Sequence, residues 1–377
     1  MKGKQGLVCM GLLLVLSSCH TGKQITASGL QRKDFQTEVN GQHTDLFTLS
    51  NKQGMEVCIT NYGARVVSIL VPDRNGKRED VVCGFSTITE YMEQRQNFGS
   101  TVGRYIGRIL NARFTLDGVE YKLVPNNGKS GHISHGGNPG FADRIWKVEQ
   151  ADTHRVRLSY LSPDGENGFP GNLKVTLVYS LGEDDNALDL TYEATTDAPT
   201  VLNLSHHSFF NISGNFTKSV EDQQLWVDAD RFTPYDDKKC VTGEYLPVAG
   251  TPLDFRMPHA IGECIDADHP QLKVVNGYDH TWELNTKGDD TRPAAWVYDP
   301  ASGRKMEIFT TEPGMQIYTG NGLKGKMTGK GGIAYPFRSA VCFETMHFQD
   351  SPNHPGFPST VLRPGEVFRS HTVYKFE

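Results

Sequence analysis

The sequence has no long hydrophobic run, few blocks of like charge and no sustained helical periodicity. Its apolar stretch at residues 7–16 would rise only ~15 Å as a helix, about half of a hydrocarbon core. Together with a mean hydropathy of −0.45, this excludes a polytopic membrane protein. The net charge of −6 gives no broad electrostatic affinity for nucleic acid, so no nucleic-acid partner is expected. The missing helical period excludes a coiled coil.

Cysteine is also scarce, with seven copies in 377 residues and no CxxC pair. Two of them lie within the first 19 residues, and an odd number remains: Cys58, Cys83, Cys240, Cys264 and Cys342. A chain of this length buries enough apolar surface to fold without disulfide bonds. We predict that these five are mostly buried free thiols and that at most one disulfide forms, with a pairing that the spacing does not define.

The first residues have the pattern of an export signal. Two lysines precede the short apolar run, which ends in Leu16-Ser17-Ser18-Cys19 and resembles the bacterial lipobox. We therefore predict a signal peptide over 1–18, a lipidated Cys19 and a polar tether over 19–40. The mature protein is then expected in the cell envelope, anchored to a bacterial membrane and facing the periplasm or the outside. An ordinary secretory leader with a chance cysteine is the alternative.

Alternation of apolar and polar residues with a period of two is the main pattern after residue 40. Residues 173–179 and 187–194 alternate on both sides of a turn, which predicts a hairpin. Asp117-Gly118 is a two-residue turn between two further alternating arms. Short strands are also expected at 296–299, 306–310 and 373–376, and 89–96 is the one candidate for a short helix.

Repeated short strands and turns predict an all-β protein, built as an antiparallel sandwich or a barrel. Residues 41–377 contain no internal repeat, low-complexity linker or sharp shift in composition, so we expect one domain there. We expect a monomer or a weak oligomer.

Two motifs occur only in weak form. Residues 320–326 have the glycine and lysine spacing of a phosphate-binding loop, but Met327 stands where Ser or Thr must reach Mg²⁺. The thirteen histidines include the neighbours His206 and His207, which point to opposite faces of a strand, and no HExxH or Cys/His cluster is present. We expect a surface loop at 320–326 and no metal site.

Polar and titratable residues gather in segments that are far apart in the chain. They are 98–109 (FGSTVGRYIGRI), 132–137 (HISHGG), 201–211 (VLNLSHHSFFN), 277–280 (GYDH), 311–321 (TEPGMQIYTGN) and 342–348 (CFETMHF). The order and the residue sequences of these segments resemble those of the galactose mutarotase (aldose 1-epimerase) family. The resemblance extends from about Thr44 to the C-terminus. It implies an antiparallel β-supersandwich.

The resemblance also implies an activity, the interconversion of the α and β anomers of free aldohexoses such as glucose and galactose. It assigns Glu344 as the catalytic base and His207 as the catalytic acid. Four further residues are implied to bind the sugar: Arg108, His135, Asp279 and Gln316. Arg104 is a competing candidate within the same motif as Arg108. No cofactor is implied, and the expected partner is a small-molecule sugar.

The residues suit this chemistry when they are considered on their own. Opening the sugar ring needs a base for the proton of the C1 hydroxyl and an acid for the ring oxygen. Period two places Glu344 on one face of its strand with Cys342 and Met346, and it places His207 opposite His206. The acid and the base can therefore share a pocket only where two such faces meet across a concave sheet.

Several alternatives remain open at this point. Each site residue could be structural: Glu344 a paired charge, His207 a satisfied core histidine, and Asp279 a turn residue. The chain could also be a glycan-binding lipoprotein without activity, or a glycosidase that uses Glu344 and Asp279 as its carboxyl pair.

Three departures from the family pattern leave the preferred sugar open. Gly107 stands where many relatives have Asn, Met346 where Gln is common and Gln349 where Pro is frequent. Reference pKa values of about 4.3 for Glu and 6.5 for His define a narrow pH window. Activity near neutral pH is therefore expected to need a raised His207 pKa, most simply through a carboxylate such as Asp279.

Overall fold

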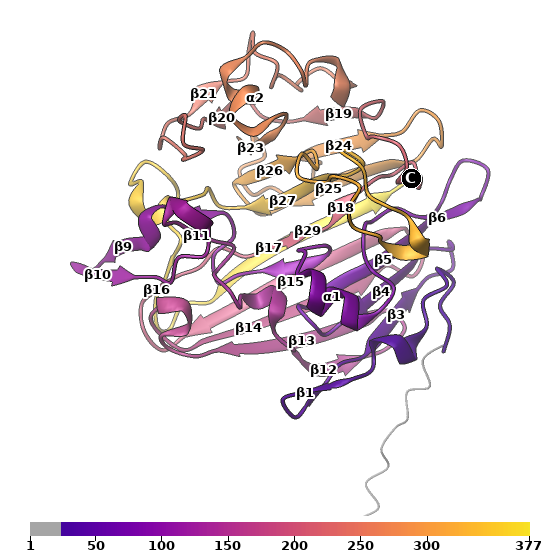
Figure 1. Ribbon diagram of the computed structural model, residues 1–377, viewed down its shortest axis with the longest axis horizontal. Coiled ribbons are helices and arrows are strands. Elements are labelled where there is room, and N and C mark those ends of the chain that lie inside the picture. Colours follow the sequence, from indigo (N-terminus) through magenta and orange to yellow (C-terminus); the bar gives the residue numbers. More distant parts are fainter. Residues whose placement is uncertain (1–23) are drawn as a thin grey trace, which may run out of the picture.

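A computed structural model describes residues 24–377, so the predicted signal peptide and Cys19 lie outside the described residues. Most of this part of the chain forms antiparallel β-structure, as expected (Figure 1). The largest sheet has nine strands, in the order β12 (Lys147–Ala151), β13 (Arg155–Ser162), β14 (Leu173–Leu181), β15 (Ala187–Thr196), β29 (Phe368–Phe376), β25 (Lys305–Thr310), β24 (Ala295–Tyr298), β19 (Gln224–Val227) and β22 (His259–Ala260).

Two smaller sheets complete the main layers. A six-stranded sheet has the order β18 (Phe209–Phe210), β27 (Val341–Met346), β26 (Gly314–Tyr318), β23 (Asp279–Glu283), β20 (Arg231–Thr233) and β21 (Leu246–Pro247). A four-stranded sheet consists of β3 (Leu46–Ser50), β4 (Glu56–Thr60), β5 (Arg65–Pro72) and β6 (Arg78–Asp80). One hydrophobic cluster includes residues from all three sheets, which makes this a sandwich around a shared core and confirms the predicted fold class.

Five short pairs of strands and a few helices complete the described chain. The pairs are β1 (Glu38–Val39) with β2 (Gln42–His43), β7 (Ser100–Val102) with β17 (Ser205–His207), β8 (Arg108–Ile109) with β11 (Ile133–Ser134), β9 (Arg113–Leu116) with β10 (Val119–Lys122), and β16 (Thr200–Val201) with β28 (Val361–Leu362). The α-helices are α1 (Ile88–Gln94) and α2 (Pro270–Val275), and eight single turns of 3₁₀-helix occur in the described chain. No helix of the described residues is long and apolar enough to span a membrane.

The predicted hairpins form, and their period-two pattern explains why. In β14 the alternate residues from Leu173 to Leu181 are buried, and β15 presents Leu188 and Leu190 to the same core. Every apolar side chain on this face leaves water, whereas the polar ones between them stay at the surface. Asp117 and Gly118 both have positive φ, at 50° and 79°, as a two-residue hairpin turn requires.

The start of the folded body differs from the prediction. Residues 24–40, expected to belong to a tether, pack against the four-stranded sheet. Phe35 is fully buried, and the backbone N–H groups of Ala27 and Ser28 donate to the carboxylate of Glu56. The two apolar side chains at Leu30 and Phe35 anchor a segment whose overall composition is polar.

The structure also tests the predictions of a short helix, of a loop at 320–326 and of free cysteines. The short helix forms as α1, one residue earlier than expected, and begins with a capping box made by Thr87 and Glu90. Residues 320–326 lie in a loop after β26, and no α-helix follows them before β27. Within the described chain all five cysteines are free, and four of them are buried, with Cys264 partly exposed.

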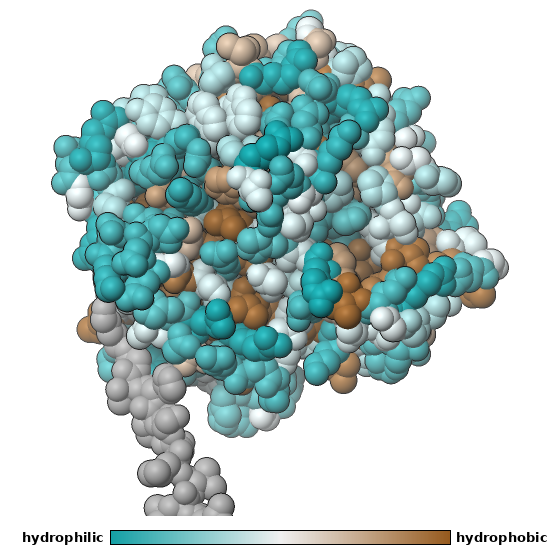
Figure 2. All heavy atoms as spheres, turned by 180° about the vertical axis from the view of Figure 1, so that it is seen from behind, coloured by the Kyte–Doolittle hydropathy of each residue, from teal (hydrophilic) through white to brown (hydrophobic). Residues whose placement is uncertain are grey.

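The face of the molecule seen from behind is mainly hydrophilic (Figure 2). Seen from behind, apolar residues show only in separate patches between hydrophilic ones (Figure 2). Eight large apolar side chains are exposed in the described chain: Ile25, Val119, Val124, Leu161, Leu246, Met257, Phe337 and Val367. Single exposed apolar side chains are normal for a folded protein.

Candidate active site

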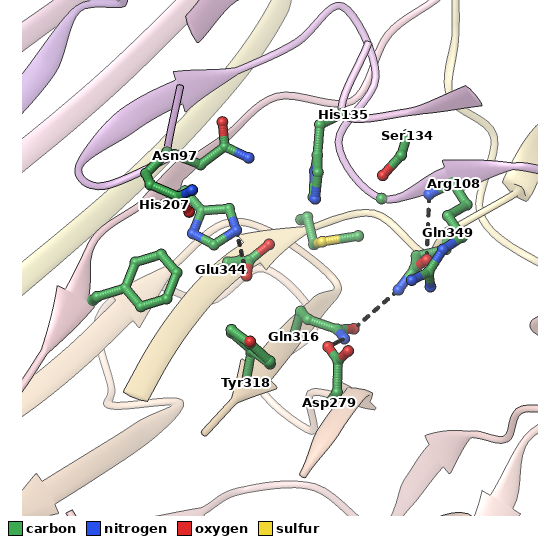
Figure 3. A pocket seen from close by; sticks show the side chains of 14 residues that line it. Asn97, Arg108, Ser134, His135, His207, Asp279, Gln316, Tyr318, Glu344 and Gln349 are labelled. Atoms are coloured by element: carbon green, nitrogen blue, oxygen red, sulfur yellow. Dashed lines mark hydrogen bonds and ion pairs between the residues drawn. The ribbon is translucent and has the colours of Figure 1, made fainter. Parts of the chain in front are cut away.

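One face of the six-stranded sheet forms the floor of a polar pocket. In register across three strands, Thr281 lies opposite Gln316 and Gln316 lies opposite Glu344. The next row along the same face contains Asp279, paired with Tyr318. Since side chains of one face repeat every second residue, these polar groups point to the same side of the sheet. The wall above them comes from β8, β11 and the loops around them (Figure 3).

The pocket has a volume of about 240 Å³, which suits a small polar molecule. All six residues expected to act on a sugar line it. The complete lining is Gln96, Asn97, Gly107, Arg108, Ser134, His135, His207, Phe209, Asp279, Gln316, Tyr318, Glu344, Met346 and Gln349.

His207 and Glu344 meet directly in this pocket. His207 comes from β17, which pairs with β7, and the chain then continues into β18, which pairs with β27. This path brings Nε2 of His207 to 3.3 Å from Oε1 of Glu344, and both side chains are buried. The opposite ring nitrogen, Nδ1, is 3.6 Å from the Sγ of Cys342, and the ring stacks on Phe209. The predicted meeting of the two strand faces therefore occurs.

Burial shifts both pKa values of this pair toward the uncharged forms. It raises the pKa of the Glu344 carboxyl well above its usual 4.5, and the nearby charge of Asp279 adds to this effect. It lowers the pKa of the His207 imidazole well below its usual 6.5, and His135 lowers it further. Desolvation of both charges opposes the ion-pair form of these two groups.

The expectation of a raised His207 pKa was therefore wrong. Asp279 contacts Gln316 rather than His207: the Gln316 amide donates from Nε2 to Oδ1 of Asp279 at 2.6 Å. Burial raises the pKa of Asp279, although the positive charge of Arg108 and this hydrogen bond oppose the increase. Asp279 is thus placed to accept hydrogen bonds from a ligand, and it does not hold a proton on His207.

Arg108 and His135 lie on the pocket wall. Arg108 pairs with Ser134 in the β8–β11 ladder, and the backbone N–H of His135 donates to the carbonyl of Gly107. Burial lowers the pKa of His135 to about 4, helped by the charge of Arg108, so its imidazole is neutral at pH 7. Its ring centroid lies 5.5 Å from that of His207. Within the described chain, the guanidinium of Arg108 has no hydrogen-bond or ion-pair partner, which leaves its donors for a ligand.

Arg104, the competing candidate, has a different place. Its guanidinium is buried away from the pocket, where it donates to the carbonyls of Pro170 and Gly171 and to the hydroxyl of Ser162. These bonds connect the loop of Arg104 to a second loop and to the end of β13, so Arg104 is a structural residue. The arginine that reaches the pocket is Arg108.

The sequence did not identify every residue of the site. Phe209, Ser134 and Tyr318 lie within the quoted motifs, where they were not distinguished from core residues. Asn97 directly precedes the first motif and carried no signal of its own. The support for Gln316 from Thr281 and Tyr235 also comes from outside the motifs: the sheet register brings Thr281 beside Gln316, and Tyr235 lies in the loop after β20.

The ligand atoms of His207, Cys342 and Glu344 lie within 4.8 Å of one another, which raises the question of a metal. A metal needs one imidazole nitrogen, a thiolate and a carboxylate directed at one centre. Here the thiol and the carboxyl face opposite nitrogens of the His207 ring. Burial also raises the pKa values of Cys342 and Glu344, which favours the protonated forms that do not bind metals.

Comparison with known proteins gives one consistent result. The sequence model of the aldose 1-epimerase family matches residues 45–375. A galactose mutarotase from Bos taurus is 40% identical over 331 residues, covering 88% of this chain and 93% of the relative. An aldose 1-epimerase from Escherichia coli K12 is 36% identical over 339 residues, covering 89% of this chain and 96% of that protein.

Solved structures show the same likeness in three dimensions. An aldose epimerase homologue from C. elegans superposes with a TM-score of 0.81 at 31% identity, covering 89% of this chain and 99% of its own. A galactose 1-epimerase from Lactobacillus acidophilus NCFM has a TM-score of 0.78 at 28% identity, covering 90% of this chain and 96% of its own. With its sandwich, its polar pocket and a match across nearly the whole described chain, the protein belongs to the aldose 1-epimerase family.

Proposed function

We propose that this protein is a mutarotase, which interconverts the α and β anomers of free aldohexoses such as glucose and galactose. Glu344 is the base and His207 is the acid. The observation that supports these roles most directly is the contact between His207 Nε2 and Glu344 Oε1, 3.3 Å apart on the floor of a polar pocket. The family membership supports the activity.

The proton transfers balance without any other reactant. Glu344 as carboxylate takes the proton of the C1 hydroxyl, while His207 as imidazolium gives its proton to the ring oxygen. The bond between C1 and the ring oxygen breaks, and an open-chain aldehyde forms. After rotation about the C1–C2 bond, the ring oxygen attacks the other face of C1, and both protons return. Two positioned groups are enough for this reaction.

The electrostatics of the pocket favour the ring-open stage. Ring opening leaves Glu344 protonated and His207 neutral, which is the state that burial favours for these two groups. The closed sugar reacts with the charged form of the pair, in which Glu344 is a carboxylate and His207 is an imidazolium. The charged and the neutral forms of the pair differ only in which of the two residues holds the transferable proton. The pocket therefore stabilises the protonation state that accompanies the least stable form of the sugar.

The remaining four residues bind hydroxyl groups in this proposal. Arg108 and the neutral His135 donate hydrogen bonds from the wall. Asp279 accepts with the oxygen that Gln316 leaves free, and Gln316 lies beside it on the floor. Hydrogen bonds of this kind hold the sugar with C1 at the acid–base pair.

Polarimetry of freshly dissolved α-glucose and α-galactose tests the activity. The purified protein should accelerate the change in optical rotation, and Glu344→Gln should abolish most of the acceleration. A glycan-binding protein without activity would bind sugar and leave the rotation rate unchanged. A glycosidase would release reducing sugar from aryl glycosides, which a mutarotase leaves intact.

We also propose that the protein works in the bacterial cell envelope, attached by lipid on Cys19. The support is the short apolar run that ends in Leu16-Ser17-Ser18-Cys19. One acyl chain alone binds a membrane marginally, so stable attachment needs the several chains that a lipoprotein carries.

A further inference from the structure

Gly107 and Gln349 fit together at the edge of the pocket. Gly107 precedes Arg108 and has a φ of +76°, which favours glycine. A Cβ atom added there would lie 2.5 Å from Cγ and 3.0 Å from Cδ of Gln349. No side chain at position 107 can occupy this space while Gln349 does. The glycine therefore makes the room that the glutamine fills.

Every hydrogen-bonding group of the Gln349 amide is directed by a neighbour. Its Oε1 accepts from the backbone N–H of Arg108 at 3.2 Å. Its Nε2 donates to the hydroxyl of Tyr235 at 2.7 Å and to Oε1 of Gln316 at 3.3 Å. The residue is 4% exposed, so water does not compete freely for these groups. The amide consequently has one defined orientation.

The orientation of the Gln349 amide also constrains the neighbouring amide of Gln316. Oε1 of Gln316 accepts from Gln349 and from the hydroxyl of Thr281. Its Nε2 must therefore face the other way, toward Oδ1 of Asp279, where it donates at 2.6 Å. If Gln316 were flipped, its NH₂ group would face the NH₂ group of Gln349. Gln349, together with Thr281, thus holds Gln316 in the orientation in which its Nε2 donates to Asp279 (Figure 3).

We propose that Gln349 is a positioning residue that sets the sugar preference of this pocket, in a space that Gly107 leaves open. It holds the Gln316–Asp279 pair from one side and the backbone of Arg108 from the other. The groups it positions bind hydroxyls, whereas the proton-transfer pair, His207 with Glu344, does not touch it. The inference rests on the proposed mutarotase function.

The proposal is tested by a substitution that removes the amide of Gln349 and keeps a side chain of similar size in its place. Gln349→Met keeps a side chain of similar length and removes every hydrogen bond. We expect KM for galactose and glucose to rise about tenfold or more, with kcat changed less than about threefold, since loss of buried hydrogen bonds weakens ground-state and transition-state binding alike. The ratio of kcat/KM between these two sugars, which differ at one hydroxyl, should shift. Gln150→Met is the matched control, because Gln150 is exposed on β12.

A double-mutant cycle tests the fit between the two positions. Asn tolerates a positive φ better than most residues, so Gly107→Asn should raise KM mainly by displacing Gln349. In the Gln349→Ala background the same change should add little, and the two effects should be far from multiplicative. Multiplicative effects, or an unchanged KM and sugar ratio in Gln349→Met, would overturn the proposal. An inactive wild type would refute the mutarotase function instead, and galactose affinity by calorimetry would still test Gln349.

Discussion

Two ionisable side chains in contact, both buried, are costly unless they serve a purpose. Desolvation works against the charged forms of His207 and Glu344, and replacing such a pair by apolar residues often leaves a protein equally stable. Strongly shifted pKa values in a pocket are typical of catalytic groups. The pair is therefore better explained by proton transfer than by stability.

The first prediction concerns the two groups of this pair. Glu344→Gln and His207→Ala should each reduce kcat for mutarotation by about 10²–10⁴, the range of one general acid–base step. Since the two act as one proton-transfer unit, the double variant should be little slower than either single one. Polarimetry measures the rates, and thermal unfolding checks that the variants are folded. Losses that multiply in the double variant would show two groups working independently.

The pH dependence of kcat/KM follows from the shifted pKa values of the pair. The reaction needs one proton on the pair. A second proton binds only when the pH falls to the lowered pKa of His207, and the single proton leaves only when the pH rises to the raised pKa of Glu344. The profile should be a plateau, with its acid limb below 6.5 and its alkaline limb well above 4.5, the ordinary pKa values of His207 and Glu344.

Both limbs belong to the coupled pair rather than to single residues. An acid limb at or above pH 6.5, or an alkaline limb at or below pH 4.5, would contradict the shifted pKa values of the pair. EDTA should have no effect on the plateau rate, because neither proton transfer needs a Lewis acid. Inactivation by EDTA that zinc reverses would contradict the assignment of both groups.

At the scale of elements, His371 joins a strand pair to a loop. It lies on β29, and its two ring nitrogens are 3.0 Å from Asp189 on β15 and 2.7 Å from Asp290 in the loop before β24. Hydrogen bonding to Asp189 and then to Asp290 outweighs partial burial and raises its pKa to about 9. The folded state thus binds this proton more tightly than the unfolded state does. The stabilisation is complete below the unfolded pKa of about 6.5 and is lost as the pH rises through 9.

His371→Gln should therefore lower the melting temperature at pH 6 by a few degrees, about the effect of one partly exposed ion pair. The difference from the wild type should shrink toward zero at pH 10. Lys375→Gln, at a half-buried position on the same strand, serves as a comparison whose effect should change less over this range. A constant difference between pH 6 and 10 would show that packing, and not the charge of His371, is responsible.

Local patterns predicted the elements well and their partners poorly. The β14–β15 hairpin and the turn at Asp117 follow from alternation and turn chemistry within a dozen residues. The pairing of β17 with β7, which directs His207 into the pocket, joins segments about a hundred residues apart and has no local signal. The family resemblance implied His207 and Glu344 as a pair, but their shifted pKa values depend on burial that only the assembled sheets create.

At the scale of the whole molecule, the length of chain between Cys19 and the folded body limits how far the body of a lipidated protein could lie from the membrane. The packed body begins near Ile25, which bridges to Gln31, so a lipid on Cys19 would be connected through very few residues. Five extended residues reach only about 18 Å. Residues 24–40 of the predicted tether at 19–40 belong to the folded body, so in the proposed lipoprotein this body would lie close to the bilayer surface.

The last prediction tests this attachment. Cys19→Ala in the full-length chain should move the protein from the membrane fraction to the released fraction, because the apolar run at 7–16 is too short to span a bilayer by itself. The mass of the wild-type N-terminal peptide should begin at Cys19 and include acyl chains, and Cys9→Ala is the matched control. Mutarotation should be equal in both forms, since the His207–Glu344 pocket is built entirely from the folded body. Wild-type protein without acyl mass, or a Cys19→Ala variant that stays with the membrane, would contradict the lipoprotein proposal and leave the enzymatic one intact.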